Sequence, residues 1–233
     1  MKKILILFLI IGLFFPSISS VLAARGFATA SSQYLTASAV LTAVPISMAC
    51  WYITNGVAFQ NLINLGVSGS NDNRFSLLLT DSVKTVVRAQ TRTTTNAIAD
   101  TTATYSTGVW QHAAAVFTSA ASRDVYLNGG NSANNTGNRT PAGVNETSLA
   151  VNSTLTESFL DGQLAECGIW NAALTAAEVA SLADGVTPLQ IRPNNLVFYA
   201  PLVRGDRDLV GGLTITAVNS PTVTAHTRVF RTR

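Results

Sequence analysis

Short β-rich runs separated by turn residues constrain this chain more than any other feature of its sequence. After residue 25, runs rich in Val, Ile, Thr, Tyr, Phe and Trp alternate with clusters of Gly, Asn, Asp and Ser, which is the pattern of consecutive strands and tight turns. The clearest runs are residues 45–54, 74–80, 82–90, 110–118, 123–128 and 163–170. Residues 131–145 are rich in Asn, Gly and Thr and predict a long loop. Many short strands without an intervening linker predict an all-β, two-sheet antiparallel sandwich of the jelly-roll type.

One segment is predicted to be helical. Thr175 and Glu178 stand three residues apart, the spacing of a capping box in which each side chain bonds the other residue's backbone amide. Gly185 suits the left-handed position at a helix end, and Pro188 prevents the helix from continuing. The sequence therefore predicts one short helix near residues 175–184.

The first 24 residues have the plan of a secretory signal peptide. Two lysines give a positive start, residues 4–15 are almost purely apolar, and small residues occupy the positions before a cleavage site. A membrane anchor is the alternative, but the apolar run is too short to cross about 30 Å of hydrocarbon as a helix. We expect cleavage after Ala23 or Ala24 and a single domain over residues 25–233, with no integral membrane segment. The protein would then be secreted, periplasmic or on the cell surface.

The charge balance indicates no nucleic-acid partner. The chain has 15 Lys and Arg against 12 Asp and Glu. Two of the basic residues lie in the predicted leader, so the remaining domain is close to neutral, and it has no basic run or stripe.

Four segments resemble those of one protein family, in the same order and at similar spacing. Residues 108–114 (GVWQHAA) look like a strand of laminin-G domains, and residues 123–129 (RDVYLNG) look like the following strand and turn. Residues 159–166 (FLDGQLAE) resemble a later strand, and residues 169–175 (IWNAALT) resemble the lead into a short helix. Over residues 27–185 the chain thus resembles the laminin-G-like domain of the concanavalin A-like lectin/glucanase superfamily, in its bacterial or phage-type secreted form.

This resemblance implies a concanavalin A-like fold in which the tail, residues 194–229, adds strands to the sandwich. The superfamily contains carbohydrate binders, adhesion modules, pentraxin relatives and glycosidases. Membership therefore does not fix the function.

The paired-carboxylate strand motif of this superfamily's glucanases is missing from the sequence. A retaining glycosidase needs two carboxyl groups about 5 Å apart, and glucanases of this superfamily carry them on one strand as E-x-D-x-E, a string that does not occur here. The nearest carboxylate pair, Asp206 and Asp208, is flanked by arginines and is interpreted as a solvated turn. His112 and His226 are the only histidines, too few for a catalytic zinc, and neither accompanies a nucleophile motif. We expect no catalysis and a structural, hydrogen-bonded role for His112.

Calcium is the one cofactor that the sequence leaves open. Several laminin-G and pentraxin relatives bind it at loop rims, and the ion takes six or more oxygen ligands. The candidate ligands, all in or near predicted loops, are Asp72, Asn73, Asp124 and Asp161. The chain has no D-x-D-x-D-G loop, and ordinary turn chemistry is the alternative for these residues.

A glycan site would combine an aromatic ring for stacking with polar groups for hydroxyls. Trp51, Trp110 and Trp170 occupy strand positions that the family buries, so we expect them in the core. Residues 84, 88 and 90 share one face of the predicted strand at 82–90, which either lines a ligand groove or simply faces solvent. The candidate ligand contacts are Lys84, Arg88, Gln90 and Tyr126.

Cys50 and Cys167, the only cysteines, lie in two predicted strands. Export would place them in an oxidising compartment, where a lone pair predicts one disulfide. Two buried free thiols are the alternative.

The sequence predicts a secreted, non-catalytic binding or adhesion module for carbohydrate or a glycosylated surface. One alternative is a structural protein of a cell surface or virion, such as a tail-fibre component. A glycosidase with an atypical site is the other. The sequence names neither the glycan nor the oligomeric state.

Overall fold

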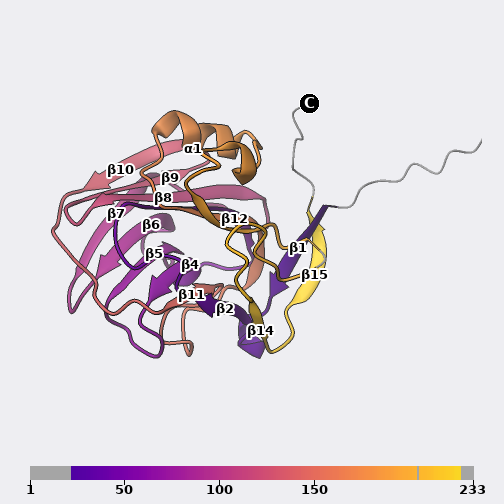
Figure 1. Cartoon of the computed structure of the whole chain (residues 1–233). Coiled ribbons are helices and arrows are strands. Elements are labelled where there is room, and N and C mark those ends of the chain that lie inside the picture. Colours follow the sequence, from indigo (N-terminus) through magenta and orange to yellow (C-terminus); the bar gives the residue numbers. More distant parts are fainter. Residues whose placement is uncertain (1–21, 204, 227–233) are drawn as a thin grey trace, which may run out of the picture.

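The computed structural model describes residues 22–203 and 205–226. Within this part the chain forms two antiparallel sheets packed into a sandwich, with one α-helix (Figure 1). The predicted all-β jelly-roll class is confirmed.

The eight-stranded sheet has the order β10-β9-β8-β3-β12-β1-β15, and β13 pairs with β12 beyond the main path. Its strands are β10 (Gly130–Asn135), β9 (Ser122–Leu127), β8 (Gln111–Ser119), β3 (Ile46–Thr54), β12 (Gly162–Trp170), β1 (Leu22–Phe27), β15 (Thr222–His226) and β13 (Leu196–Ala200). The helix α1 (Ala176–Ala183) covers this sheet from outside, above β8 and β3 (Figure 1).

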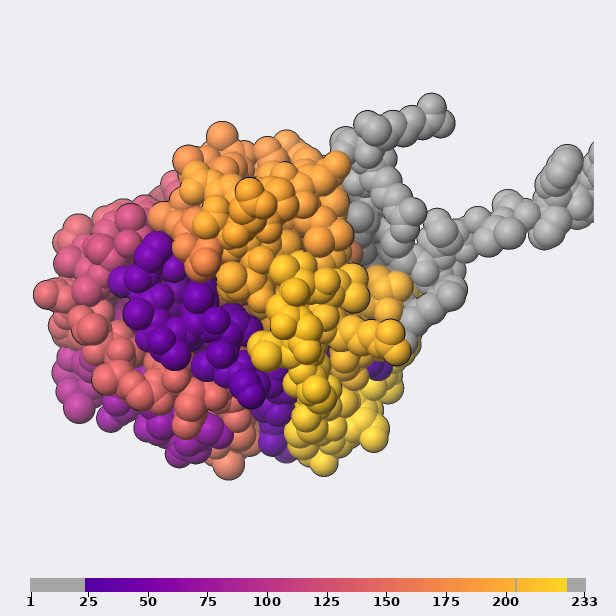
Figure 2. All heavy atoms as spheres, in the orientation of Figure 1, coloured from indigo at the N-terminus to yellow at the C-terminus, as the bar shows by residue number. Residues whose placement is uncertain are grey.

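The seven-stranded sheet has the order β14-β2-β11-β4-β5-β6-β7. Its strands are β14 (Thr216–Val218), β2 (Tyr34–Ser38), β11 (Glu146–Leu149), β4 (Gln60–Gly66), β5 (Arg74–Leu79), β6 (Val86–Arg92) and β7 (Asn96–Thr104). Two short 3₁₀ turns, η1 (Thr29–Ser31) and η2 (Pro188–Gln190), complete the elements. Figure 2 shows the C-terminal segment in yellow beside the N-terminal one in indigo, because β15 pairs with β1 and β14 pairs with β2.

The main core lies between the two sheets and follows from strand alternation. On β5, Phe75, Leu77 and Leu79 are buried in this core, and on β3 the same is true of Met48 and Tyr52. Successive side chains of a strand point to opposite faces, so the residues between them lie on the outer faces of the sandwich.

A second apolar cluster lies between α1 and the eight-stranded sheet. The predicted helix is confirmed, since Thr175 is its N-cap and forms the capping box with Glu178. Val179 and Leu182 of α1 are buried against Trp170 in this cluster. The expected interior position of Trp170 is therefore confirmed, although the residue lies under the helix and outside the main core.

Three local expectations were wrong. The strand expected at 82–90 begins only at Val86, because Thr85 has a φ of 56° and its amide donates to the carbonyl oxygen of Asp81, closing a turn. The expected loop at 131–145 contains most of β10, which gains its backbone partners from β9. Trp110 is half-buried on the outer face, where it packs with Trp51 on a small cluster, and is not a core residue.

Most of the predicted leader, residues 1–21, lies outside the described residues, while residues 22–24 form the first half of β1. No helix among the described residues is long and apolar enough to span a membrane. The tail strands β13, β14 and β15 all pair with strands of the sandwich.

Candidate functional site

The outer face of the seven-stranded sheet carries polar side chains aligned across four strands. Because Phe75 and Leu77 enter the core, alternation turns Arg74, Ser76 and Leu78 of β5 outward. Strand register then aligns each of them with one residue on β4, one on β6 and one on β7. The three rows are Asn61, Leu78, Arg88 and Asp100; Asn64, Ser76, Gln90 and Ile98; and Gly66, Arg74, Arg92 and Asn96.

A groove of about 360 Å³ lies on this face, and we call it the polar groove. The sheet contributes Asn61, Arg74, Leu78, Arg88, Gln90 and Asn96 to its lining. Loops contribute Phe59, Asn71, Asn152, Glu157 and Ser158. Its volume falls at the small end of the roughly 300–1,000 Å³ typical of ligand sites.

An ion-pair cluster holds the β6–β7 side of the groove. Asp100 accepts hydrogen bonds from Arg88 Nε at 2.5 Å and Nη2 at 2.9 Å, and from Lys84 Nζ at 2.6 Å. Burial alone would raise the pKa of Asp100, but the bonds from Arg88 and Lys84 outweigh it and lower the pKa. The carboxylate therefore stays ionised and neutralises part of the cationic charge.

The other carboxylates near the groove are also engaged. Arg92 Nε donates to Asp72 Oδ1 at 2.8 Å, and its Nη1 donates to Asn96 Oδ1 at 3.0 Å. Asn152 Nδ2 donates to Glu157 Oε1 at 3.0 Å. These contacts fix the ends and the loop wall of the groove.

Two lining side chains keep unused hydrogen-bonding capacity. Asn61 is 3% exposed, and its Oδ1 has no partner in the described part of the chain. Arg74 is 7% exposed, its Nη1 donates to Asn71 Oδ1, and its Nε has no partner there. Burial, followed by the nearby Arg92, lowers the pKa of Arg74 to about 10, so the guanidinium still carries its charge at neutral pH. Since buried polar atoms are almost always satisfied by protein or by water, these two are candidate contacts for a ligand in the groove.

Phe59 gives the groove an exposed aromatic ring. It is 46% exposed and precedes β4, and the Arg88 guanidinium carbon lies 5.9 Å from its ring centroid. The same ring and Glu157 border a second hollow of about 530 Å³. The groove thus combines a ring face with several polar groups.

The predicted ligand contacts are only partly brought together. Arg88 and Gln90 both line the groove, as alternation along one strand suggested. Lys84 lies in the turn before β6 and acts through Asp100. Tyr126 belongs to the other sheet, where it is buried beneath α1, so it cannot join them.

The four predicted calcium ligands do not form one site. Asp72 pairs with Arg92, and Asn73 Oδ1 accepts from the amide of Ala142. Asp124 lies in the other sheet, on β9, and accepts from Asn134, while Asp161 precedes β12. No group of three or more His, Cys, Asp or Glu that could hold a metal occurs among residues 22–203 and 205–226. These residues therefore do not fit a shared calcium ion.

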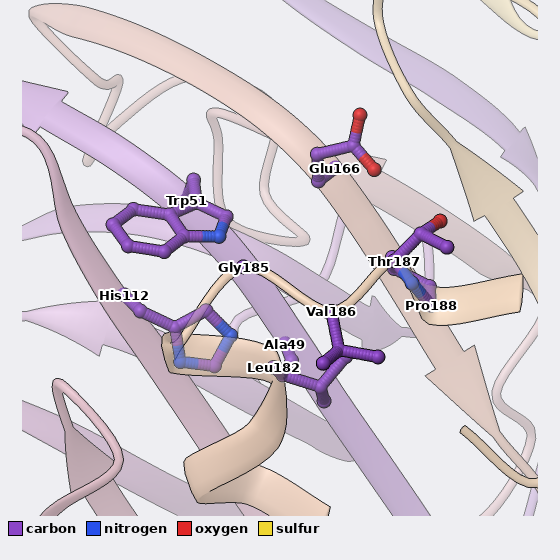
Figure 3. A pocket seen from close by; sticks show the side chains of 9 residues that line it. All are labelled: Ala49, Trp51, His112, Glu166, Leu182, Gly185, Val186, Thr187 and Pro188. Carbon is purple, nitrogen blue, oxygen red and sulfur yellow. The ribbon is translucent and has the colours of Figure 1, made fainter. Parts of the chain in front are cut away.

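A small enclosed pocket on the eight-stranded sheet holds His112. His112 and Trp51 lie side by side with ring centroids 5.5 Å apart, under the segment that follows α1, and Glu166 lies at the other end (Figure 3). His112 is 2% exposed and its Nδ1 has no partner in the described chain, unlike the hydrogen-bonded role expected. The free space is about 10 Å³, which is at most one water molecule. The pocket cannot admit a sugar.

Cys50 and Cys167 are both fully buried and occur as free thiols on the paired strands β3 and β12. Burial raises the pKa of Cys167, and a hydrogen bond with Cys50 raises it further. The two thiols are therefore neighbours, and the disulfide expected between them stays a prediction.

The carboxylate pair interpreted as a solvated turn is part of the scaffold. Asp206 Oδ1 forms an ion pair with Arg25 at 2.6 Å. Asp208 is 8% exposed and accepts from four backbone amides, those of Tyr199, Val210, Gly211 and Leu213. Both carboxylates hold the tail against the sandwich.

Comparisons with known proteins identify relatives of this fold. The Laminin_G_3 family model, described as the concanavalin A-like lectin/glucanases superfamily, matches residues 28–180. No match was found by sequence among curated proteins.

Three solved structures are similar at low sequence identity. A heptameric SAP-like pentraxin from Limulus polyphemus has a TM-score of 0.57 at 14% identity, covering 87% of this chain and 94% of that one. The Ruminococcus gnavus IT-sialidase CBM40 bound to α2,3 sialyllactose has a TM-score of 0.55 at 16% identity, covering 70% and 98%. Domain 4 of AbnA, a GH43 extracellular arabinanase from Geobacillus stearothermophilus in complex with arabinotriose, has a TM-score of 0.52 at 18% identity, covering 63% and 70%.

Proposed function

This chain belongs to the concanavalin A-like lectin/glucanase superfamily, and from that premise we propose that it is a non-catalytic module that binds carbohydrate in the polar groove. The observation that carries the proposal is the meeting of unpartnered, buried polar atoms on Asn61 and Arg74 with the exposed ring of Phe59. Sugars present both polar hydroxyls and apolar ring faces, and ligand sites match such surfaces with a few placed polar groups beside aromatic ones. The oligosaccharides bound to the CBM40 module and to the arabinanase domain support a glycan ligand here.

The state of the carboxylates supports binding without chemistry. A glycosidase needs one carboxylic acid held protonated and a second carboxylate beside it. Beside the groove, Asp100 and Asp72 are each paired with arginines. Glu157, the carboxylate that lines the groove, accepts a hydrogen bond from Asn152, and no second carboxylate of the described chain lines the groove beside it. The pKa of Asp100 is lowered, the opposite of what an acid catalyst requires.

A glycan array with matched variants tests this proposal. We expect the wild type to bind at least one glycan, and Phe59→Ala and Asn61→Ala each to weaken that binding about tenfold or more, in line with the loss of a placed contact. Asn171→Ala, the same substitution at an exposed asparagine after β12, should leave binding unchanged. Reducing ends should not appear on prolonged incubation with the bound glycan.

Two results would contradict the proposal. One is the absence of binding to any glycan by folded protein. The other is binding that neither groove variant weakens. Phe59 is exposed, so its truncation should leave the fold intact even where that of the buried Asn61 does not. Melting curves of each variant separate misfolding from lost contact.

The proposal also places the module outside the cytoplasm, through the predicted leader of residues 1–24. Intact mass of the exported protein should correspond to a chain that starts at Ala24 or Arg25. Recovery of the exported protein with its first 23 residues attached would contradict this.

A further inference from the structure

We propose that the ligand of the polar groove is an acidic glycan, whose oxyanion binds the guanidinium of Arg74. This inference rests on the proposed function and names the class of sugar that the groove takes. It is carried by the hydrogen bonding of Arg74, by the charge balance around it and by the position of Asn61.

Arg74 is a buried cation whose donors are largely unused. In the described chain its one hydrogen bond runs from Nη1 to Asn71 Oδ1, and no carboxylate lies within ion-pair distance. A guanidinium offers five donors in a planar fork that fits an oxyanion with two parallel bonds. Most of that fork is left for a ligand.

Arg123 is a buried arginine with a structural role and serves as a comparison for Arg74. It is fully buried, yet all three of its nitrogens donate: Nε to Thr91, Nη1 to Asn135, and Nη2 to the carbonyl oxygens of Ala120 and Gly137. Arg74 is nearly as buried, but only one of its guanidinium nitrogens donates a hydrogen bond within the described chain. Burial alone therefore does not explain why most donors of Arg74 are unused.

The charges around the groove leave one cation over. The cations are Lys84, Arg74, Arg88 and Arg92, and the carboxylates are Asp72, Asp100 and Glu157. Four cations face three anions. Arg92 is paired with Asp72, and Lys84 and Arg88 share Asp100, while Arg74 and Glu157 form no ion pair among the described residues. The groove as a whole therefore keeps one positive charge, and Arg74 is the one of these four cations without an ion-pair partner. A charge-assisted bond from a ligand oxyanion would satisfy it.

Asn61 orients the same ligand. Its free Oδ1 is an acceptor, which favours a hydroxyl and disfavours an anion. Its cross-strand partner on β5 is Leu78, four residues from Arg74, so about 13 Å of strand separates the two positions. The ligand then places hydroxyls toward Asn61 and its acidic group toward Arg74.

Calorimetric titration with pairs of glycans, each an acidic glycan and its neutral counterpart, tests the inference. The pairs are oligogalacturonate and its methyl ester, α2,3-sialyllactose and lactose, and dextran sulfate and dextran. We expect the acidic member of at least one pair to bind ten times more tightly or better. The first two pairs probe a carboxylate and the third a sulfate. Binding of the acidic member should weaken as salt is raised.

Arginine variants show whether one guanidinium is responsible. Arg74→Met should remove the preference within the pair, Arg74→Lys should keep part of it because it retains the charge without the fork, and Arg192→Met, at the α1 side, should leave it unchanged. Equal binding of both members, or equal loss in Arg74→Met and Arg192→Met, would overturn the inference and leave the proposed function standing. If folded protein binds neither these glycans nor any on the array, both fail.

Discussion

Buried titratable side chains on the eight-stranded sheet set how the protein responds to pH. Burial lowers the pKa of His112 from 6.5 to about 3. Burial raises the pKa of Glu166 from 4.5 to about 6, although the hydrogen bond from Tyr199 opposes this. The folded protein therefore prefers the neutral form of both residues, and their effects on stability have opposite signs.

The contributions of His112 and Glu166 to the free energy of unfolding change with pH in opposite directions and can be measured separately. As pH falls below 6.5, the unfolded chain protonates at His112 while the folded protein does not, so stability is lost, by up to about 5 kcal/mol near pH 3 at about 1.4 kcal/mol per pKa unit. For Glu166 the folded protein binds its proton first, so stability is gained as pH falls from 6 to 4.5, by about 2 kcal/mol.

Urea unfolding between pH 7 and pH 4 should resolve the two contributions. Relative to the wild type, His112→Gln should become more stable as pH falls, and Glu166→Gln should become less stable over the same interval. Parallel stability curves for the wild type and both variants would show that these groups are not buried as described.

The two thiols give a second residue-scale prediction. Cys50 and Cys167 are neighbours on paired strands, and a bond between them would close a loop of more than a hundred residues, for which chain entropy predicts about 4–5 kcal/mol of stabilisation. We expect exported protein unfolded in iodoacetamide without reductant to gain no mass, and to gain two carbamidomethyl groups after reduction. Two groups added without reduction would contradict the disulfide.

At the scale of elements, α1 depends on its cap. Thr175 Oγ1 accepts from the amide of Glu178, and the Glu178 carboxylate accepts from the amide of Thr175. Thr175→Ala should therefore lower the free energy of unfolding by about 1 kcal/mol, measured by urea denaturation. Ser181→Ala, at a half-buried position of the same helix where the hydroxyl only donates back to the carbonyl oxygen of Ala177, should change it by less than about 0.5 kcal/mol. A cap variant as stable as the wild type would show that the box contributes nothing.

Sequence patterns revealed elements wherever local and tertiary preferences agree. The alternation of Phe75, Leu77 and Leu79 predicts β5, and the box at Thr175 predicts α1. The sequence does not predict strand β10, because its Asn and Ser residues are typical of a loop. Backbone pairing with β9 makes this segment a strand.

The candidate site was less visible in the sequence for a similar reason. Arg88 and Gln90 could be found because they alternate along one strand. Arg74 stands at the start of an apolar run, and its unused donors become evident only when the fold shows what surrounds it. Asn152 and Glu157 reach the groove from a loop more than sixty residues further along the chain.

At the scale of the whole molecule, the two outer faces differ. Over β8, β3, β12 and β13 the eight-stranded sheet is covered by α1 and η2, which leave the small pocket beside His112 in this region (Figure 3). The seven-stranded sheet lies on the side of the sandwich away from α1 (Figure 1). Its outer face bears the polar groove. The proposed binding therefore assigns the ligand to the face that lacks the helix.

Amide chemical-shift mapping by NMR, with the glycan that binds best on the array, tests this central claim most directly. Titration should shift the amides of β4, β5 and β6 around Asn61, Arg74 and Gln90, leave those of α1 in place, and return the glycan uncleaved. Shifts confined to α1 and the pocket beside His112, or a glycan hydrolysed during the titration, would contradict the account.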